Sequence, residues 1–266
     1  MTNKFPELDG VITYIQNRLD EPLELNMLAK YAGYSPYHFA RIFKARMGLP
    51  PLYYVSSLRL HRAKELLLHT NLSIRDISLE IGQQSLGTFT SRFTEKVGVT
   101  PSLFRNSREI ADNHLTSLKT LDNWDDLPAL MTPMGTVEGS ISFEVPFEGV
   151  VLIGLFSKPI PEGLPPYGTL LSSASRRFRF TGVNPGTYYL LATSVPWGMR
   201  AVDFLVPQTT LRAKHKVPIV VGPDKSVPFQ RVHMRVPHPD DPPILISLPL
   251  LMNNFLHINN QLSNRQ

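Results

Sequence analysis

The sequence predicts a multidomain protein of the α and β class, with an all-α region over residues 1–107 followed by an antiparallel β-sandwich over residues 135–248. Two observations support this division. In the first part, apolar residues recur three and four positions apart, which places them on one face of a helix. In the second part, short runs of β-branched and aromatic residues alternate with proline and glycine, as expected for a protein made of short strands.

Length and composition exclude several classes of protein. A chain of 266 residues with 42% hydrophobic residues can bury two cores. It contains no cysteine, which excludes disulfide bonds, thiolate nucleophiles and thiolate metal ligands. It has neither a long apolar run nor a secretory signal at its start, so we expect a cytoplasmic location and no membrane partner. A net charge of +5 suits a polyanionic partner but does not establish one.

Seven short helices are expected within residues 1–107, because capping residues and glycines divide this region. A serine or threonine at a helix start accepts hydrogen bonds from free backbone N–H groups, and proline fits the first turn. Glycine adopts the positive φ with which many helices end. The expected helices contain Leu8 to Leu19, run from Leu25 to just before Gly33, open at Ser35, extend from about Pro51 to Leu68, and begin at Ser73, Ser85 and Thr100.

The rest of the chain is assigned by similar rules. Residues 108–134 are expected to form a partly helical connector that contains an acidic run, and residues 249–266 a tail that can form a helix. No helix-length amphipathic segment interrupts the strands before that tail, which disfavours a parallel α/β sheet. The strands are expected at 141–145, 150–156, 177–180, 188–192, 219–221, 232–236 and Ile244–Leu248.

A repeat with a period of 50 residues lies within the helical region. Each copy has a short helix, a glycine, a capping serine and a second helix with phenylalanines four residues apart, so that one face is anchored and polar residues project from the other. This is the arrangement of a helix-turn-helix, and we infer two such units. The matching pairs are Ser35 with Ser85, Phe39 with Phe89, Phe43 with Phe93, Gly48 with Gly98, Pro51 with Pro101, and Tyr54 with Phe104.

The polar faces of the two second helices predict binding to duplex DNA. Residues 35–47 contain Arg41, Lys44 and Arg46 and no acid. Arginine can bind a guanine edge, and lysine can neutralise phosphate. Taken singly, such charges are usually ordinary solvated residues, but their duplication in a capped unit favours DNA binding. The predicted contacts are Ser35, Tyr37, His38, Arg41 and Lys44 in the first copy, and Ser85, Leu86, Gly87, Thr88, Ser91 and Arg92 in the second.

The helical region resembles the AraC/XylS family of transcription regulators over about residues 5–107. The resemblance is carried by the run from Ile81 to Arg105, with support from Leu28-Ala29 and Gly33-Tyr34-Ser35. Gln83 replaces the family's usual aromatic residue. Because Leu86 and Gly87 cannot make polar base contacts, we expect the first copy to supply most base discrimination, or DNA shape to be read. The resemblance implies two recognition helices in successive major-groove segments, with Tyr37, Ala40, Arg41, Leu86, Gly87 and Ser91 facing the groove.

The β region resembles the prealbumin-like sandwich of carboxypeptidase regulatory domains, around residues 135–141 and 178–192. In a regulator this domain suits effector sensing or dimerisation. The candidate ligand contacts are Tyr167, Trp197 and Arg200, although a core tryptophan and a solvated arginine explain the latter two at least as well. His233 and His238 match no spacing of metal ligands, so no metal and no other cofactor is expected.

These observations predict a sequence-specific DNA-binding transcription regulator, acting as an activator and modulated through its β domain. The expected partners are double-stranded promoter DNA, RNA polymerase, a small-molecule or protein effector, and a second copy of the chain in a homodimer. One alternative is a non-specific architectural DNA binder. The other is an enzyme with a DNA-binding module, which is disfavoured because alkyl-transfer repair needs a cysteine and no catalytic triad or phosphate-binding motif is present. We therefore predict no enzymatic activity.

Overall fold

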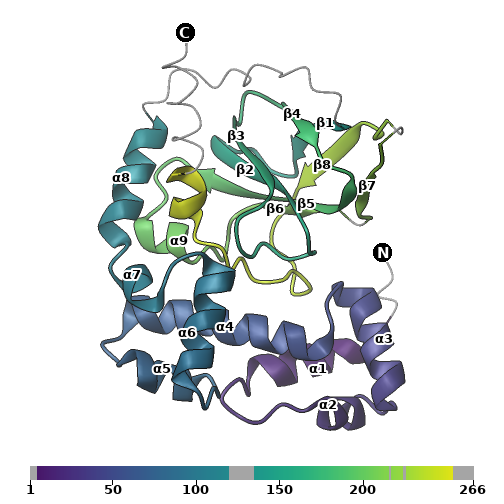
Figure 1. The fold of residues 1–266 in the computed structure, drawn as a ribbon, viewed down its shortest axis with the longest axis vertical. Coiled ribbons are helices and arrows are strands. Elements are labelled where there is room, and N and C mark those ends of the chain that lie inside the picture. The colour runs from purple at the N-terminus through teal and green to yellow at the C-terminus, as the bar shows by residue number, and fades with distance from the viewer. Residues whose placement is uncertain (1–4, 120–134, 216, 224–225, 254–266) are drawn as a thin grey trace. The chain divides into compact units, whose positions relative to one another are not determined.

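The computed structural model describes residues 5–119, 135–215, 217–223 and 226–253 (Figure 1). The chain forms two compact units. The helical unit comprises Met1–Asn106 together with Pro239–Leu245, and the β unit comprises Ser107–His238 together with Ile246–Gln266. Among the described residues, no helix is both long enough and apolar enough to cross a membrane.

The helices that follow Ser35 and Ser85 begin where these capping residues predict them. The side chain of Ser35 accepts a hydrogen bond from the His38 N–H at 3.4 Å, and Ser85 accepts one from the Thr88 N–H at 3.3 Å. The helices are α1 (Glu7–Gln16), α2 (Leu25–Tyr31), α3 (Pro36–Met47), α4 (Pro51–His69), α5 (Ile74–Glu80), α6 (Leu86–Val97) and α7 (Pro101–Arg105). The helix-turn-helix units predicted from the repeat are therefore α2–α3 and α5–α6.

Aromatic residues at equivalent positions of the repeat make equivalent contacts. Phe43 of α3 packs on Tyr54 of α4 with ring centroids 5.6 Å apart, and Phe93 of α6 packs on Phe104 of α7 at 5.7 Å. Both phenylalanines are fully buried. Edge-to-face packing of this kind adds to the stabilisation gained by removing the rings from water. Each second helix is thus fixed to the helix that follows it.

The segment Pro239–Leu245 packs within the helical unit. The predicted strand over Ile244–Leu248 is wrong, because these residues form no strand and residues 248–253 are helical. The carbonyls of Ile244 and Leu245 instead accept hydrogen bonds from Nζ of Lys64, at 2.9 and 3.1 Å. The preceding Pro242-Pro243 pair has no N–H groups to give to a neighbouring strand, which opposes pairing in a sheet.

The β unit begins with a helix and continues as two sheets (Figure 1). One sheet has the strand order β4-β1-β8, and the other has the order β3-β2-β5-β6, with β7 also paired to β5. The elements are α8 (Arg108–Lys119), β1 (Gly135–Phe143), β2 (Gly149–Phe156), β3 (Tyr167–Ser172), β4 (Arg177–Val183), β5 (Gly186–Pro196), α9 (Ala201–Leu205), β6 (Arg212–Lys214), β7 (Ile219–Val221) and β8 (Gln230–Met234).

The sheet β4-β1-β8 is mixed in strand direction, which corrects the prediction of a purely antiparallel domain. Strand β8 pairs with β1 in parallel, from Gly139 opposite Gln230 to Phe143 opposite Met234. The other strand pairs of the two sheets are antiparallel. Antiparallel pairing was expected because no long helix separates the strands. That reasoning fails for β8, which follows the whole second sheet and whose direction is not set by a hairpin.

The two sheets bury a common hydrophobic cluster, and neither closes into a barrel. Phe178 and Phe180 of β4 contribute to it, as do Val151 and Ile153 of β2. Strand β2 is buried along its whole length, on both faces. Such a strand reads as a continuous apolar run rather than an alternating one, which agrees with the sequence VVLIGLF. The predicted connector beyond Lys119 and the tail beyond Asn253 lie outside the described residues.

We expect Phe93→Ala to lower the free energy of unfolding by about 3–5 kcal/mol, because it removes a fully buried ring and leaves a cavity against Phe104. The measurement is urea unfolding followed by far-ultraviolet circular dichroism. Tyr37→Ala is the control, since that ring is 83% exposed and its loss should change the unfolding free energy by less than about 0.5 kcal/mol. Equal effects of the two substitutions would contradict the assignment of Phe93 to the core.

Candidate nucleic-acid interface

All the predicted DNA contacts lie at least partly exposed on the structure. In α3 and its cap, Ser35, Tyr37, Arg41 and Lys44 are exposed, while His38 and Ala40 are half-buried. In α6 and its cap, the exposed residues are Ser85, Leu86, Gly87, Thr88, Ser91 and Arg92. The phenylalanines at i and i+4 bury the opposite face of each helix. Each second helix therefore presents its predicted contacts to solvent.

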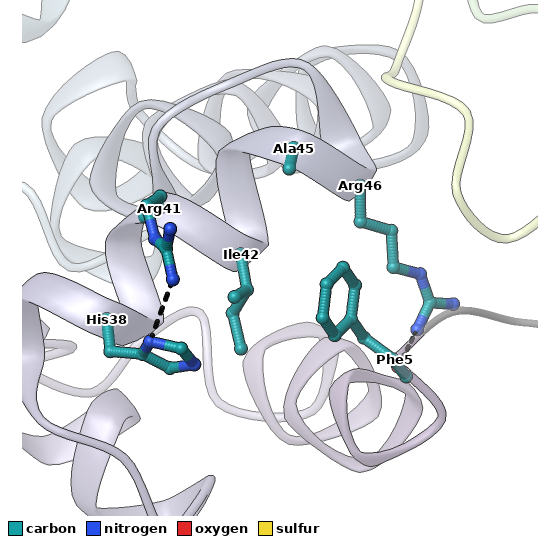
Figure 2. Close-up of a pocket in the computed structure, with 6 residues that line it drawn as sticks. All are labelled: Phe5, His38, Arg41, Ile42, Ala45 and Arg46. Atoms are coloured by element: carbon teal, nitrogen blue, oxygen red, sulfur yellow. Dashed lines mark hydrogen bonds between the residues drawn. The ribbon is translucent and has the colours of Figure 1, made fainter.

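A chain of contacts from α1 holds Arg41 in place. Figure 2 shows the Arg41 guanidinium pointing at His38, with Nη2 3.2 Å from the ring Nδ1. The His38 ring packs on Tyr34 with centroids 4.9 Å apart, and the Tyr34 hydroxyl donates to Glu7 Oε1 at 2.7 Å. This hydrogen bond lowers the pKa of Glu7, which keeps the carboxylate charged. Sequence reasoning missed Glu7 and Tyr34, since an acid in a first helical turn reads as an ordinary helix-end charge.

The contact between Arg41 and His38 leaves most of the guanidinium available. Arginine has donors only, so Nδ1 of His38 accepts, and a neutral ring then carries its proton on Nε2. Four of the five guanidinium N–H groups are not needed for this bond. They are enough for a bidentate contact with a guanine edge, which uses two. Both residues also line a surface pocket beside Phe5, Ile42 and Ala45 (Figure 2).

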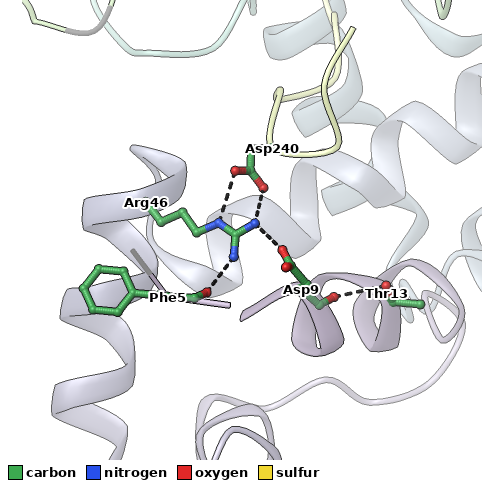
Figure 3. A network of polar contacts seen from close by, with 5 residues as sticks. All are labelled: Phe5, Asp9, Thr13, Arg46 and Asp240. Atoms are coloured by element: carbon green, nitrogen blue, oxygen red, sulfur yellow. Dashed lines mark hydrogen bonds and ion pairs between the residues drawn. The ribbon is translucent and has the colours of Figure 1, made fainter. Parts of the chain in front are cut away.

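Arg46, the third basic residue of α3, is committed to contacts inside the helical unit. Figure 3 shows its guanidinium between Asp240, Asp9 and the carbonyl of Phe5. The bonds to Asp240 measure 3.1 and 2.7 Å, and the side chain is 8% exposed. Burial acts to lower the pKa of Arg46, but the hydrogen bonds to Asp240 and Asp9 outweigh it and raise the pKa. Of the three basic residues in α3, Arg41 and Lys44 remain as exposed cations.

Helix α6 carries fewer available charges than its sequence suggests. Arg92 is exposed, but Lys96 donates a hydrogen bond to the Tyr53 hydroxyl at 2.9 Å and lies over the same ring. Tyr53 belongs to α4, so Lys96 connects the end of α6 to the helix that joins the two helix-turn-helix units. That α6 contributes less polar base reading than α3 stays a prediction.

Arg59 of α4 connects the loop after α1 with the turn of the second unit. It donates to the carbonyls of Leu19 and Glu21, at 2.8 and 2.6 Å. The turn of the second unit passes so close that a Cβ on Gly82 would lie 2.9 Å from Arg59 Nη2. Gly82 also has φ +70°, a conformation that favours glycine. The glycine of the second turn thus permits both the backbone geometry and the close approach.

The three candidate ligand contacts of the β unit do not share one place. Tyr167 pairs with Leu155 at one end of β2, whereas Pro196, which precedes Trp197, pairs with Gly149 at the other end. Six residues of strand separate these ends by about 20 Å. The Tyr167 hydroxyl is bonded to the backbone N–H of Asn184, and Arg200 pairs with Asp203. Ligand binding at these residues stays a prediction, and the register separates Tyr167 from Trp197 and Arg200.

The helical unit contains two capped helix-turn-helix units that are joined by one long helix. Each of them presents one polar helix face to solvent, which is the arrangement of a double helix-turn-helix protein. The family model described as a helix-turn-helix domain matches residues 28–107. The transcriptional activator AarP of Providencia stuartii is 33% identical over 100 residues, which cover 38% of this chain and 74% of AarP. The bifunctional transcriptional activator and DNA repair enzyme AdaA of Bacillus subtilis is 34% identical over 107 residues, covering 40% of this chain and 51% of AdaA.

The chain belongs to the AraC/XylS family of helix-turn-helix transcriptional regulators, as its resemblance predicted. A solved regulator from Chromobacterium violaceum with an AraC-type DNA-binding domain is 33% identical, covering 38% of this chain and 91% of the solved chain with a TM-score of 0.37. The matches span 40% of the Bacillus regulator YobQ and 51% of AdaA, so these relatives carry other parts of their own. The prealbumin-like resemblance of the β unit stays a prediction.

We expect Gly82→Ala to destabilise the protein more than Gly33→Ala. Both glycines have positive φ, which costs a residue with a Cβ about 1–2 kcal/mol, but Gly33 has no atom within 4 Å of its added Cβ. At Gly82 the new carbon would also meet the Asp20 carbonyl at 3.0 Å and displace Arg59. Thermal unfolding of the two variants measures the difference. A loss at Gly33 equal to that at Gly82 would show that the close approach to Arg59 carries no energetic weight.

Proposed function

We propose that the chain is a sequence-specific DNA-binding transcription regulator that acts as an activator. The observation that carries this proposal is the duplicated unit, in which α3 and α6 each bury a phenylalanine pair and expose the residues predicted to face DNA. A protein that only needed a stable helical bundle would not require two exposed, capped helices of matching design. The family membership supports the same conclusion.

The two recognition helices take different parts in binding. Arg41 makes a bidentate contact with a guanine edge, Lys44 neutralises a phosphate, and the capped start of α3 at Ser35 directs free N–H groups at a phosphate oxygen. Helix α6 positions the protein through phosphate contacts from Thr88 and Arg92. Leu86, 42% exposed, contacts a thymine methyl group.

The β unit modulates DNA binding, as an effector-binding or dimerisation domain. Its two sheets and their shared cluster support a sandwich architecture, with β8 as a parallel edge strand. The likeness to AarP, which is named an activator, supports recruitment of RNA polymerase by the DNA-bound form. The proposed partners of the chain are promoter DNA, RNA polymerase, an effector and a second copy of the chain. The regulator acts in the cytoplasm and performs no catalysis.

The test is selection of duplexes from a random pool at physiological salt, with the full chain. We expect enrichment of a site with two sequence blocks about one helical turn apart, which is roughly 34 Å along the duplex. Affinity that varies little with sequence would instead indicate an architectural binder, whose binding comes from phosphates alone. Failure to retain any duplex would refute the proposed function.

Two substitutions in α3 separate base reading from phosphate binding. Arg41→Ala should weaken binding to the selected site by about 1–3 kcal/mol and relax the preference at one base pair. Lys44→Ala should weaken binding to all sequences and reduce the salt slope by about one unit. Fluorescence anisotropy titrations on matched and mismatched duplexes at several salt concentrations measure both effects. Unchanged selectivity in the Arg41 variant, or a sequence-dependent loss in the Lys44 variant, would reverse the assignments.

A further inference from the structure

The segment Pro239–Leu245 contacts the first helix-turn-helix unit and the helix α4 that joins it to the second. At its start, Asp240 binds Arg46 near the end of α3 (Figure 3). At its end, the carbonyls of Ile244 and Leu245 accept hydrogen bonds from Lys64 in the middle of α4. Four to five residues span at most about 13–18 Å when fully extended. The segment therefore runs from the recognition helix of the first unit to the helix that joins the two units.

Through Lys64, the segment is also connected to α6 of the second helix-turn-helix unit. Its Nζ lies 5.4 Å from the ring centroid of Phe104 in α7, and Phe104 packs on Phe93 of α6. The segment, α4, α7 and α6 are thus linked by successive contacts. A change at the segment reaches α3 through Arg46 and α6 through Lys64, Phe104 and Phe93.

The docked segment is held by buried residues and not only by contacts at the surface. Ile244 and Leu245 are 3% and 0% exposed, and the two prolines before them are buried. Prolines restrict the undocked chain, so less conformational entropy is lost on docking. Lys64 is completely buried, and its burial lowers its pKa to about 7. Without the two carbonyls, this buried group would lose its hydrogen-bond acceptors, which is costly in an apolar site.

The chain on either side of the segment belongs to the other unit. Residues up to His238 and from Ile246 onward are part of the β unit. A rearrangement of the β unit is therefore transmitted to the segment through covalent bonds at both ends. Among the described residues after Asn106, no other stretch belongs to the helical unit.

We propose that Pro239–Leu245 is a regulatory clasp whose docking holds α3 and α6 in the relative placement that binding to two successive major-groove segments requires. The β unit controls DNA binding by docking or releasing this clasp. The proposal rests on the proposed function for its consequence, but docking of the segment can be measured in the absence of DNA. Because linkage is reciprocal, DNA that favours the docked state must also stabilise docking.

The absence of cysteine in the chain gives a direct test. In full-length Leu245→Cys, the rate of thiol labelling reports release of the clasp, and Ala174→Cys on an exposed loop of the β unit provides the reference rate. We expect labelling at position 245 to be much slower than at position 174. Saturating the protein with its selected duplex should slow labelling at position 245 about 5-fold or more and leave position 174 unchanged. Ile244→Cys serves in the same way if Leu245→Cys fails to fold.

A second change tests the role of Asp240 without DNA. Adding Asp240→Ala to the Leu245→Cys protein should accelerate labelling several-fold, because it removes the clasp's contact with Arg46. Glu21→Ala, which removes an exposed ion pair with Arg18 in the same unit, should leave the rate unchanged. The same substitution also has an expected effect on DNA binding. In the anisotropy assay, Asp240→Ala should weaken the preference for the selected spacing of the two blocks over spacings changed by one base pair. Arg41→Ala should leave this preference for spacing unchanged.

The outcomes separate the clasp from the proposed function. Faster labelling at position 245 in the presence of DNA would show that docking opposes binding, and an unchanged rate in a DNA-bound protein would show static packing; either result overturns the clasp. A protein that binds no duplex refutes the proposed function alone. In that case the effect of Asp240→Ala on labelling still decides whether the segment docks through Arg46.

Discussion

The packing of Phe43 on Tyr54 and of Phe93 on Phe104 orients the faces that α3 and α6 present to solvent. A helix anchored by phenylalanines at i and i+4 has only one face left for solvent. In α3 this places Tyr37, Arg41 and Lys44 outward. Since the aromatic partner lies on the following helix in both copies, the two outward faces are fixed relative to α4 and α7 rather than to flexible loops. The proposed reading of two groove segments depends on this rigidity.

The features of the helical unit that follow from local chemistry could be predicted from the sequence. Ser35 and Ser85 cap their helices as expected, and Gly48 and Gly98 end them in the left-handed conformation. Such features depend on a few neighbouring residues, and the repeat doubled each signal. The exposure of the predicted DNA contacts followed from the phenylalanine spacing alone.

Features that depend on distant parts of the chain could not be predicted. Arg46 looks like Arg41 in the sequence, but Asp240 lies 194 positions away and withdraws it from solvent. Nothing in the sequence near Lys64 marks it as buried, yet it is fully buried. The parallel pairing of β8 with β1 likewise joins strands separated by the whole second sheet. In each case the partner, rather than the residue, determines the outcome, and no spacing rule identifies the partner.

Lys64 also helps to explain why the segment Pro239–Leu245 packs within the helical unit. An apolar residue of similar length would fill the site at a lower desolvation cost, since buried charges are often replaced by apolar residues without loss of stability. An ammonium group, unlike a methyl group, requires acceptors in fixed directions, and two successive carbonyls of the segment supply them. The lysine therefore contributes selectivity for one docked arrangement more than it contributes stability. A connection that is specific yet not strongly stabilised is suited to a segment that must dock and release.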